Sequence, residues 1–148
     1  MLYLVCHLAH ETILVVDDNP AVLRTVAAIL THAEFNVLQA VNGAAAVKLA
    51  NETEGAIDLL LSDVEMPEMS GPALGQTLKL VRPDMHVMLM SGGGQEGALL
   101  VLNYGWAFIE KPFVTAKLVQ MIQDVLHSPD RSQPGGREFD SQMDRRTV

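Results

Sequence analysis

Short apolar runs alternate along this chain with segments whose apolar residues recur at helical spacing. Five runs have the length of a β-strand, and several are continuous, as expected of strands that are covered on both faces. They lie at residues 13–16, 35–39, 57–61, 85–90 and 106–109. This alternation favours a parallel sheet, because a right-handed crossover through a helix is the natural connection between parallel neighbours.

The segments between the runs carry the pattern of amphipathic helices. Two groups of apolar residues each fall on one helical face: Val22, Val26, Ile29 and Leu30 after the first run, and Leu118, Met121, Ile122 and Val125 near the end. We predict helix caps at Asn19 and Gly71, each followed by proline at the first helical position, and further caps at Asn42 and Thr115. The predicted fold is α/β, a doubly wound five-stranded parallel sheet in a three-layer sandwich.

Length and composition fit one globular domain. The chain has 148 residues, of which 49% are hydrophobic, enough for a sizeable core. We assign residues 11–127 to this domain, residues 1–10 to a leader or an extended first strand, and residues 128–148 to a mobile tail rich in Pro, Gly, Ser and charge. The apolar residues 1–10 are too few for a membrane helix and lack the basic start of a signal peptide, so we expect no contact with a membrane.

The net charge argues against binding of nucleic acid and favours binding of cations. The net charge is −8 and the pI about 4.9, whereas a grip on phosphate backbones needs basic patches. The single cysteine, Cys6, excludes a disulfide framework within the chain and fits a reducing compartment, so we expect a cytoplasmic protein.

Polar side chains follow the predicted strands at the points where these end. Asp17 and Asp18 follow the first run, Ser62 and Asp63 the third, Ser91 the fourth, and Glu110, Lys111 and Pro112 the fifth. Ligands of doubly wound sheets bind beyond the carboxyl ends of the strands, so these residues should meet at one edge. Carboxylate oxygens suit Mg²⁺, which often shares its coordination shell with a phosphate. Two adjacent like charges also need a compensating cation, which a metal ion or the lysine would provide.

Four motifs carry a resemblance to a known family. The stretches "VVDDNP", "LLLSDVEMPEMSG", "VMLMSG" and "FIEKPF" resemble, in order and spacing, the signature of receiver domains of two-component response regulators, which are CheY-like and have the flavodoxin-like fold. The likeness runs from about residue 13 to residue 126. The "WAFIEKPF" stretch and the segment before it look especially similar to receivers of the hybrid sensor kinase type.

The resemblance implies a role for each matched residue. It makes Asp63 the phosphoacceptor and Asp18 a direct ligand of Mg²⁺ or Mn²⁺. Asp17 would support the metal through water, and the backbone carbonyl of Glu65 would complete the protein's share of the shell. Met66, Pro67 and Gly71 match the turn that follows the acceptor.

The resemblance also implies the switch. Lys111 matches the family's lysine and Ser91 its hydroxyl position, which would hydrogen-bond the new phosphoryl group. Phe108 matches an aromatic residue that turns inward when the loop moves, although many receivers have tyrosine there. A glycine-rich stretch at residues 92–97 formally fits G-x-G-x-x-G, but it follows the fourth strand instead of the first, so we interpret it as a loop next to a mobile helix.

The implied function is a phosphoacceptor switch in a phosphorelay. A sensor histidine kinase or phosphotransfer domain would donate the phosphoryl group, and self-phosphorylation and autodephosphorylation on Asp63 would be the only chemistry. Output would pass to a protein target or a homodimer through the face made by the fourth helix, the fifth strand and the fifth helix.

Two alternatives stay open. One is a Mg²⁺-dependent phosphohydrolase with an aspartate nucleophile, which would usually carry Asp-x-Asp at the first strand end, whereas this chain has "VVDDNP". The other is a pseudo-receiver that acts as an interaction module without phosphorylation. We assign no role to the five histidines.

Overall fold

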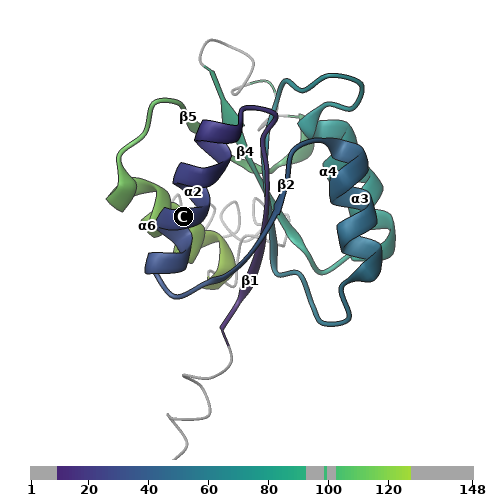
Figure 1. The fold of residues 1–148 in the computed structure, drawn as a ribbon, viewed down its shortest axis with the longest axis horizontal. Coiled ribbons are helices and arrows are strands. Elements are labelled where there is room, and N and C mark those ends of the chain that lie inside the picture. The colour runs from purple at the N-terminus through teal and green to yellow at the C-terminus, as the bar shows by residue number, and fades with distance from the viewer. Residues whose placement is uncertain (1–9, 93–98, 100–102, 128–148) are drawn as a thin grey trace, which may run out of the picture.

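Five parallel strands form a single sheet in the order β2-β1-β3-β4-β5 in the computed structural model, which describes residues 10–92, 99 and 103–127 (Figure 1). The strands are β1 (Thr12–Val16), β2 (Asn36–Ala40), β3 (Leu59–Asp63), β4 (His86–Ser91) and β5 (Ala107–Glu110). Every pairing is parallel, from β1 with β2 and β3 to β4 with β5. The predicted α/β fold with a parallel sheet is confirmed.

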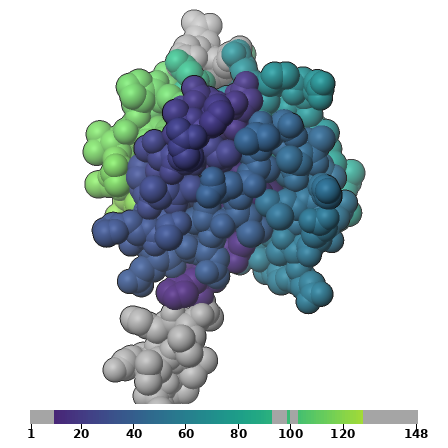
Figure 2. Space-filling model, in the orientation of Figure 1, coloured from purple at the N-terminus to yellow at the C-terminus, as the bar shows by residue number. Residues whose placement is uncertain are grey.

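Helices cover both faces of the sheet. Figure 1 shows α2 (Pro20–His32) and α6 (Thr115–His127) on one side of the strands, and α3 (Gly43–Glu52) and α4 (Gly71–Val81) on the other. The space that separates the ribbons is filled by side chains (Figure 2). Leu99, Asn103 and Tyr104 are also helical. In the part of the chain that the structure describes, no helix is long and apolar enough to span a membrane.

Two apolar clusters explain this arrangement. One cluster packs α2 and α6 against the sheet and includes Leu30, Leu61 and Ile122, all 0% exposed. The other packs α3 and α4 against the opposite face and includes Leu60 and Leu74, also 0% exposed. Because the side chains of Leu60 and Leu61 point to opposite faces of β3, both must be apolar, which is why the strands read as continuous apolar runs.

Two of the predicted helix caps are correct and two are wrong. Asn19 caps α2 and accepts hydrogen bonds from the amides of residues 21 and 22, while Asn42 caps α3 and accepts one from Ala45. Before α4 the cap is Ser70, whose hydroxyl accepts from the Ala73 amide, and Gly71 is the first helical residue. Thr115 is likewise the first residue of α6. A hydroxyl at Ser70 offers the acceptor that a glycine lacks.

Four strands begin and end one or two residues later than the apolar runs predict. The structure places Ser62 and Asp63 within β3 and Ser91 within β4, because their backbone groups continue the ladder after the apolar residues stop. Our expectations for a mobile tail and for a mobile helix next to the glycine-rich stretch at residues 92–97 fall largely outside the described residues, as does most of the predicted leader. His10 is described and exposed, and it lies outside β1.

Candidate phosphoacceptor and metal site

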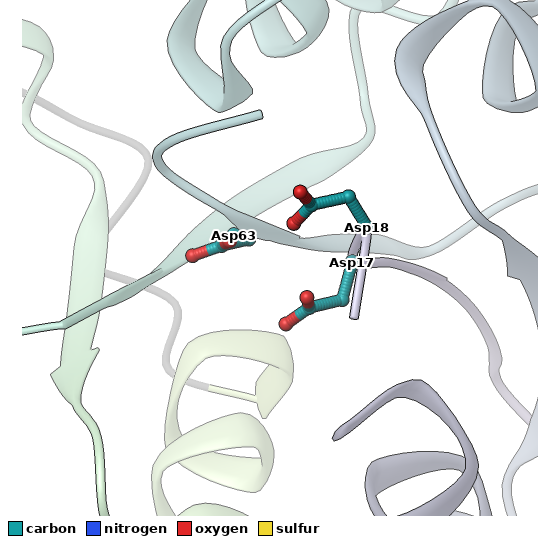
Figure 3. A group of neighbouring side chains, drawn as sticks. All are labelled: Asp17, Asp18 and Asp63. Atoms are coloured by element: carbon teal, nitrogen blue, oxygen red, sulfur yellow. The ribbon is translucent and has the colours of Figure 1, made fainter. Parts of the chain in front are cut away.

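Three carboxylates meet at the carboxyl ends of the central strands. Asp17 and Asp18 follow β1 directly, and Asp63 is the last residue of β3, which pairs with β1. Their side chains point to the same side of the sheet edge (Figure 3), and one oxygen of each lies within 4.8 Å of the others. Asp17 and Asp63 are buried, whereas Asp18 is exposed. The expected meeting of these side chains is observed.

Lys111 supplies a positive charge to this group. Its Nζ lies 3.2 Å from Asp17 Oδ2 and 3.2 Å from Asp63 Oδ1. The residue follows β5 directly, and its backbone N–H donates to the Ser91 carbonyl at 2.7 Å. The Lys111–Pro112 peptide bond is cis. One ammonium therefore stands between two of the three acids, and the group as a whole keeps an excess of negative charge.

The second oxygen of Asp17 is fixed by the backbone. Asp17 Oδ1 accepts from the N–H of Asn19 at 2.9 Å, while the Asn19 side chain caps α2. The cap and the carboxylate thus hold each other at the junction of β1 and α2. Sequence reasoning found the cap but missed this contact, because a backbone amide donor leaves no signal in the residue type.

The pKa values of Asp63 and Lys111 are both raised, which disfavours the charged form of the acid and favours the charged form of the lysine. Burial raises the pKa of Asp63, the hydrogen bond and charge of Lys111 oppose this, and the charges of Asp17 and Asp18 add to the rise. For Lys111 burial alone would lower the pKa, but the hydrogen bond and charge of Asp63, with help from Asp17, raise it overall. A further cation would therefore stabilise the charged form of Asp63, and Lys111 stays protonated.

The donor set fits a hard divalent cation. Three carboxylates offer oxygen atoms within 4.8 Å of one another, which is the ligand type that Mg²⁺ prefers. Lys111 faces one oxygen each of Asp17 and Asp63, and the Asn19 amide donates to the other oxygen of Asp17, so an ion would take the second oxygen of Asp63, the exposed Asp18 and water. Water would complete the coordination shell, as is usual for Mg²⁺ in proteins.

The other expected site residues lie around this group. Ser91 ends β4, beside Glu110 in the register with β5, and is 1% exposed. Phe108 is the second residue of β5, half-buried against the apolar cluster of α3 and α4. Glu65 is exposed in the loop after β3. Of the histidines, His10, His32, His86 and His127 are described, and none belongs to the acidic group.

Comparison with known proteins gives one consistent family. Residues 13–123 match the family model described as "Response regulator receiver domain". The chain is 31% identical over 121 residues to the sensor kinase CckA of Brucella abortus, and 32% identical over 116 residues to the transcriptional regulatory protein GlrR of Escherichia coli. These matches cover 80% and 77% of this chain, but only 13% and 26% of the length of those proteins.

Solved structures agree with this result. A response regulator receiver domain protein of Clostridium thermocellum has a TM-score of 0.73 and 25% identity, and the match covers 83% of this chain and 99% of that one. The receiver domain of the hybrid histidine kinase CckA has a TM-score of 0.65 and 35% identity, with 79% and 100% covered. The response regulator TrrA of Thermotoga maritima, solved with Mg²⁺ and BeF, has a TM-score of 0.68 and 25% identity, with 78% and 99% covered.

Proposed function

Since this chain belongs to the family of response regulator receiver domains, the phosphoacceptor switches of two-component signalling, we propose that Asp63 is its phosphoacceptor. The observation that carries the proposal is the position of the Asp63 carboxylate, 3.2 Å from the Lys111 ammonium and within 4.8 Å of the Asp17 and Asp18 carboxylates. Phosphoryl transfer depends mostly on positioning and on charge stabilisation, and this group of residues provides for both.

The chemistry follows from the charges at the site. An oxygen of Asp63 attacks the phosphorus atom of the donor, and the bond from phosphorus to the donor's nitrogen or oxygen breaks as the new P–O bond forms. Lys111 stabilises the negative charge on the transferred group. Asp18 and Asp63 would hold Mg²⁺ or Mn²⁺ directly, Asp17 would support the ion through water, and the Glu65 carbonyl would be a further ligand. When bound, the cation neutralises the phosphoryl oxygens.

The switch is proposed at Ser91 and Phe108. A phosphoryl group on Asp63 would accept a hydrogen bond from the Ser91 hydroxyl, since Ser91 ends the strand next to β3. The resulting shift of the loop after β4 would let Phe108 turn inward. Phosphorylation can shift this equilibrium only through contacts that differ between the two states, so Ser91 and Lys111 supply the energy.

The donor is proposed to be a phosphohistidine of a sensor histidine kinase or a phosphotransfer domain. The chain spans a small part of the curated relatives, which include a sensor kinase and a transcriptional regulator. Both kinds of relative match with similar identity, so the output, whether a protein target or a homodimer, is a proposal that rests on the family. The hybrid kinase type is supported by the 35% identity to the CckA receiver.

The alternative functions have less support. A phosphohydrolase of this kind would usually carry Asp-x-Asp at the first strand end, whereas this chain has Asp17 directly before Asp18, and the Asp17 carboxylate is 0% exposed and bound by Lys111 and the Asn19 amide. A pseudo-receiver would not need the acidic group and the lysine, and this chain keeps both.

Incubation with acetyl phosphate and Mg²⁺ tests the proposal. Intact mass should show one added phosphoryl group that does not form with a chelator or in Asp63→Asn. The control Asp84→Asn, which changes an exposed acid in the turn before β4, should be labelled like the wild type. Labelling of Asp63→Asn would place the acceptor elsewhere, and rapid turnover of small phosphate esters would favour the phosphohydrolase.

A further inference from the structure

Ser62 is a buried polar side chain that the proposed chemistry does not use. Four polar or charged residues are buried in the described part of the chain: Asp17, Ser62, Asp63 and Ser91. The other three belong to the site already described. Ser62 is 0% exposed and precedes the phosphoacceptor within β3. A buried hydroxyl needs a hydrogen-bond partner, so the partner of Ser62 indicates what it does.

That partner is the backbone carbonyl of Asp63. Ser62 Oγ donates to it at 2.9 Å in a buried setting. The β1–β3 register ends with the pair of Val16 and Ser62, so Asp63 lies one residue past the last pair on that side. On the other side β4 still pairs, and the N–H of Val64 donates to the Met90 carbonyl at 2.9 Å. The hydroxyl therefore supplies a donor where β1 has left the sheet.

The same carbonyl is covered by the start of α4. A Cβ atom on Gly71 would lie 2.2 Å from the Asp63 carbonyl oxygen, a distance that no side chain tolerates. The N–H of Gly71 donates to the Val64 carbonyl at 2.9 Å, which holds the two segments together. The Asp63 carbonyl is thus enclosed between the Ser62 hydroxyl and the Cα of Gly71 and has little freedom to rotate.

We propose that Ser62 is a positioning residue for phosphoryl transfer, whose hydroxyl fixes the peptide plane between Asp63 and Val64 and thereby aims the Asp63 carboxylate. The inference rests on the proposed role of Asp63 as acceptor. Fixing this plane fixes the backbone from which the Asp63 side chain departs, and with it the 3.2 Å contact to Lys111. Without the hydroxyl, the buried carbonyl would lose this donor, and the Val64 N–H and the cover of Gly71 alone would hold the plane, with more freedom than in the wild type.

Three variants separate the hydrogen bond from side-chain size. The quantity to be compared is the rate constant of Asp63 phosphorylation at saturating acetyl phosphate and Mg²⁺, followed by intact mass. Ser62→Ala should lower it about tenfold, within the loss expected when a reacting group moves by a fraction of an ångström. Ser62→Cys, close to serine in size but a weak donor, should behave like Ser62→Ala. Ser62→Thr keeps the hydroxyl and should keep most of the rate.

A spectroscopic readout and a matched control exclude a purely structural effect. The carbonyl ¹³C resonance of Asp63 should move in Ser62→Ala and stay near its wild-type position in Ser62→Thr. Thr53→Ala removes a hydroxyl that donates to the Leu49 carbonyl at 2.7 Å, far along the chain, and should leave the rate unchanged. It controls for the loss of a hydroxyl-to-carbonyl hydrogen bond as such.

The outcomes distinguish this inference from the function on which it rests. A wild-type protein that takes up no phosphoryl group would overturn both. Normal labelling of the wild type, together with an equally fast Ser62→Ala whose Asp63 carbonyl resonance has not moved, would overturn the positioning role alone.

Discussion

Asp63 carries a charge that its folded surroundings oppose when no metal ion is bound. Burial and the charges of Asp17 and Asp18 raise its pKa despite Lys111. A carboxyl group whose pKa is raised on folding contributes stability at low pH and loses it as the pH rises through the folded-state value. Without a bound metal ion, the ionised Asp63 should therefore lower the free energy of unfolding at neutral pH. Such unfavourable burial of charge is common at functional sites.

The first prediction concerns Asp63→Asn in the presence of a chelator. The variant should be more stable than the wild type at pH 7, because the amide cannot ionise, and the difference should vanish in acid, where the wild-type carboxyl is protonated. Thermal unfolding followed by circular dichroism measures it, since 1 kcal/mol shifts the melting temperature by roughly 2–8 °C in domains of this size class. Asp84→Asn is the matched control. An equal gain in stability there would mean that the effect comes from the change in net charge and not from the position of Asp63.

The second prediction concerns Lys111→Met, which should destabilise the protein. The substitution leaves Asp17, which is 0% exposed, without its cation. We expect a loss of about 2 kcal/mol, below the 3–5 kcal/mol of a fully buried pair because the Lys111 side chain is 23% exposed. Since the pKa of Lys111 is raised on folding, its contribution is present at neutral pH and is lost only in strong alkali, as the pH rises through that pKa. Urea denaturation across pH tests this, with the exposed Lys117→Met as control.

At the scale of elements, a single arginine joins the two helices on one face of the sheet. Arg82, at the end of α4, donates to the carbonyls of Ala50, Thr53 and Gly55 at 2.8–2.9 Å. These carbonyls lie at the end of α3 and in the loop that follows, where helices leave acceptors unpaired. The guanidinium thus closes the end of one helix with a side chain from another, and it holds the loop that leads into β3.

The third prediction is that Arg82→Ala destabilises the protein by about 2 kcal/mol, the range for hydrogen bonds that involve a charged group. Arg82→Lys should recover only part of this, because an ammonium cannot reach three carbonyls with the geometry of the planar guanidinium. Chemical denaturation measures both, and Arg24→Ala, on the exposed side of α2, should change little. A loss as large in Arg24→Ala would mean that general charge effects dominate.

For the whole molecule, the sequence was sufficient for the number of strands, for their alternation with helices and for the acidic group. Strands buried on both faces must be apolar throughout, so the five runs could be read directly, and the acids at the carboxyl ends of parallel strands then had to converge. The contacts that were missed lack such a pattern. Arg82 reaches partners 27 to 32 residues away. The Ser62 hydroxyl donates to a backbone carbonyl and the Asp17 carboxylate accepts from a backbone N–H, and such backbone groups leave no mark in the residue type. Their roles depend on where the chain turns, which spacing alone does not specify.

The last prediction concerns the negative charge of the molecule and the stabilisation that Mg²⁺ gives at the acidic site. With a net charge of −8, any salt should relieve repulsion in all variants alike, so Mg²⁺ is compared with NaCl of equal ionic strength. Mg²⁺ bound at the acidic site should stabilise the wild type by about 1.4 kcal/mol for each tenfold excess over its dissociation constant. Asp63→Asn lacks a ligand and should gain less, so its advantage over the wild type in chelator shrinks as the Mg²⁺ concentration rises. Asp84→Asn should gain as much as the wild type.

The gain should also fade as the pH drops through the raised pKa of Asp63, because protons and the metal compete for the same carboxylate. Equal gains in the wild type and in Asp63→Asn would show that Mg²⁺ acts on the surface charge and not at this site.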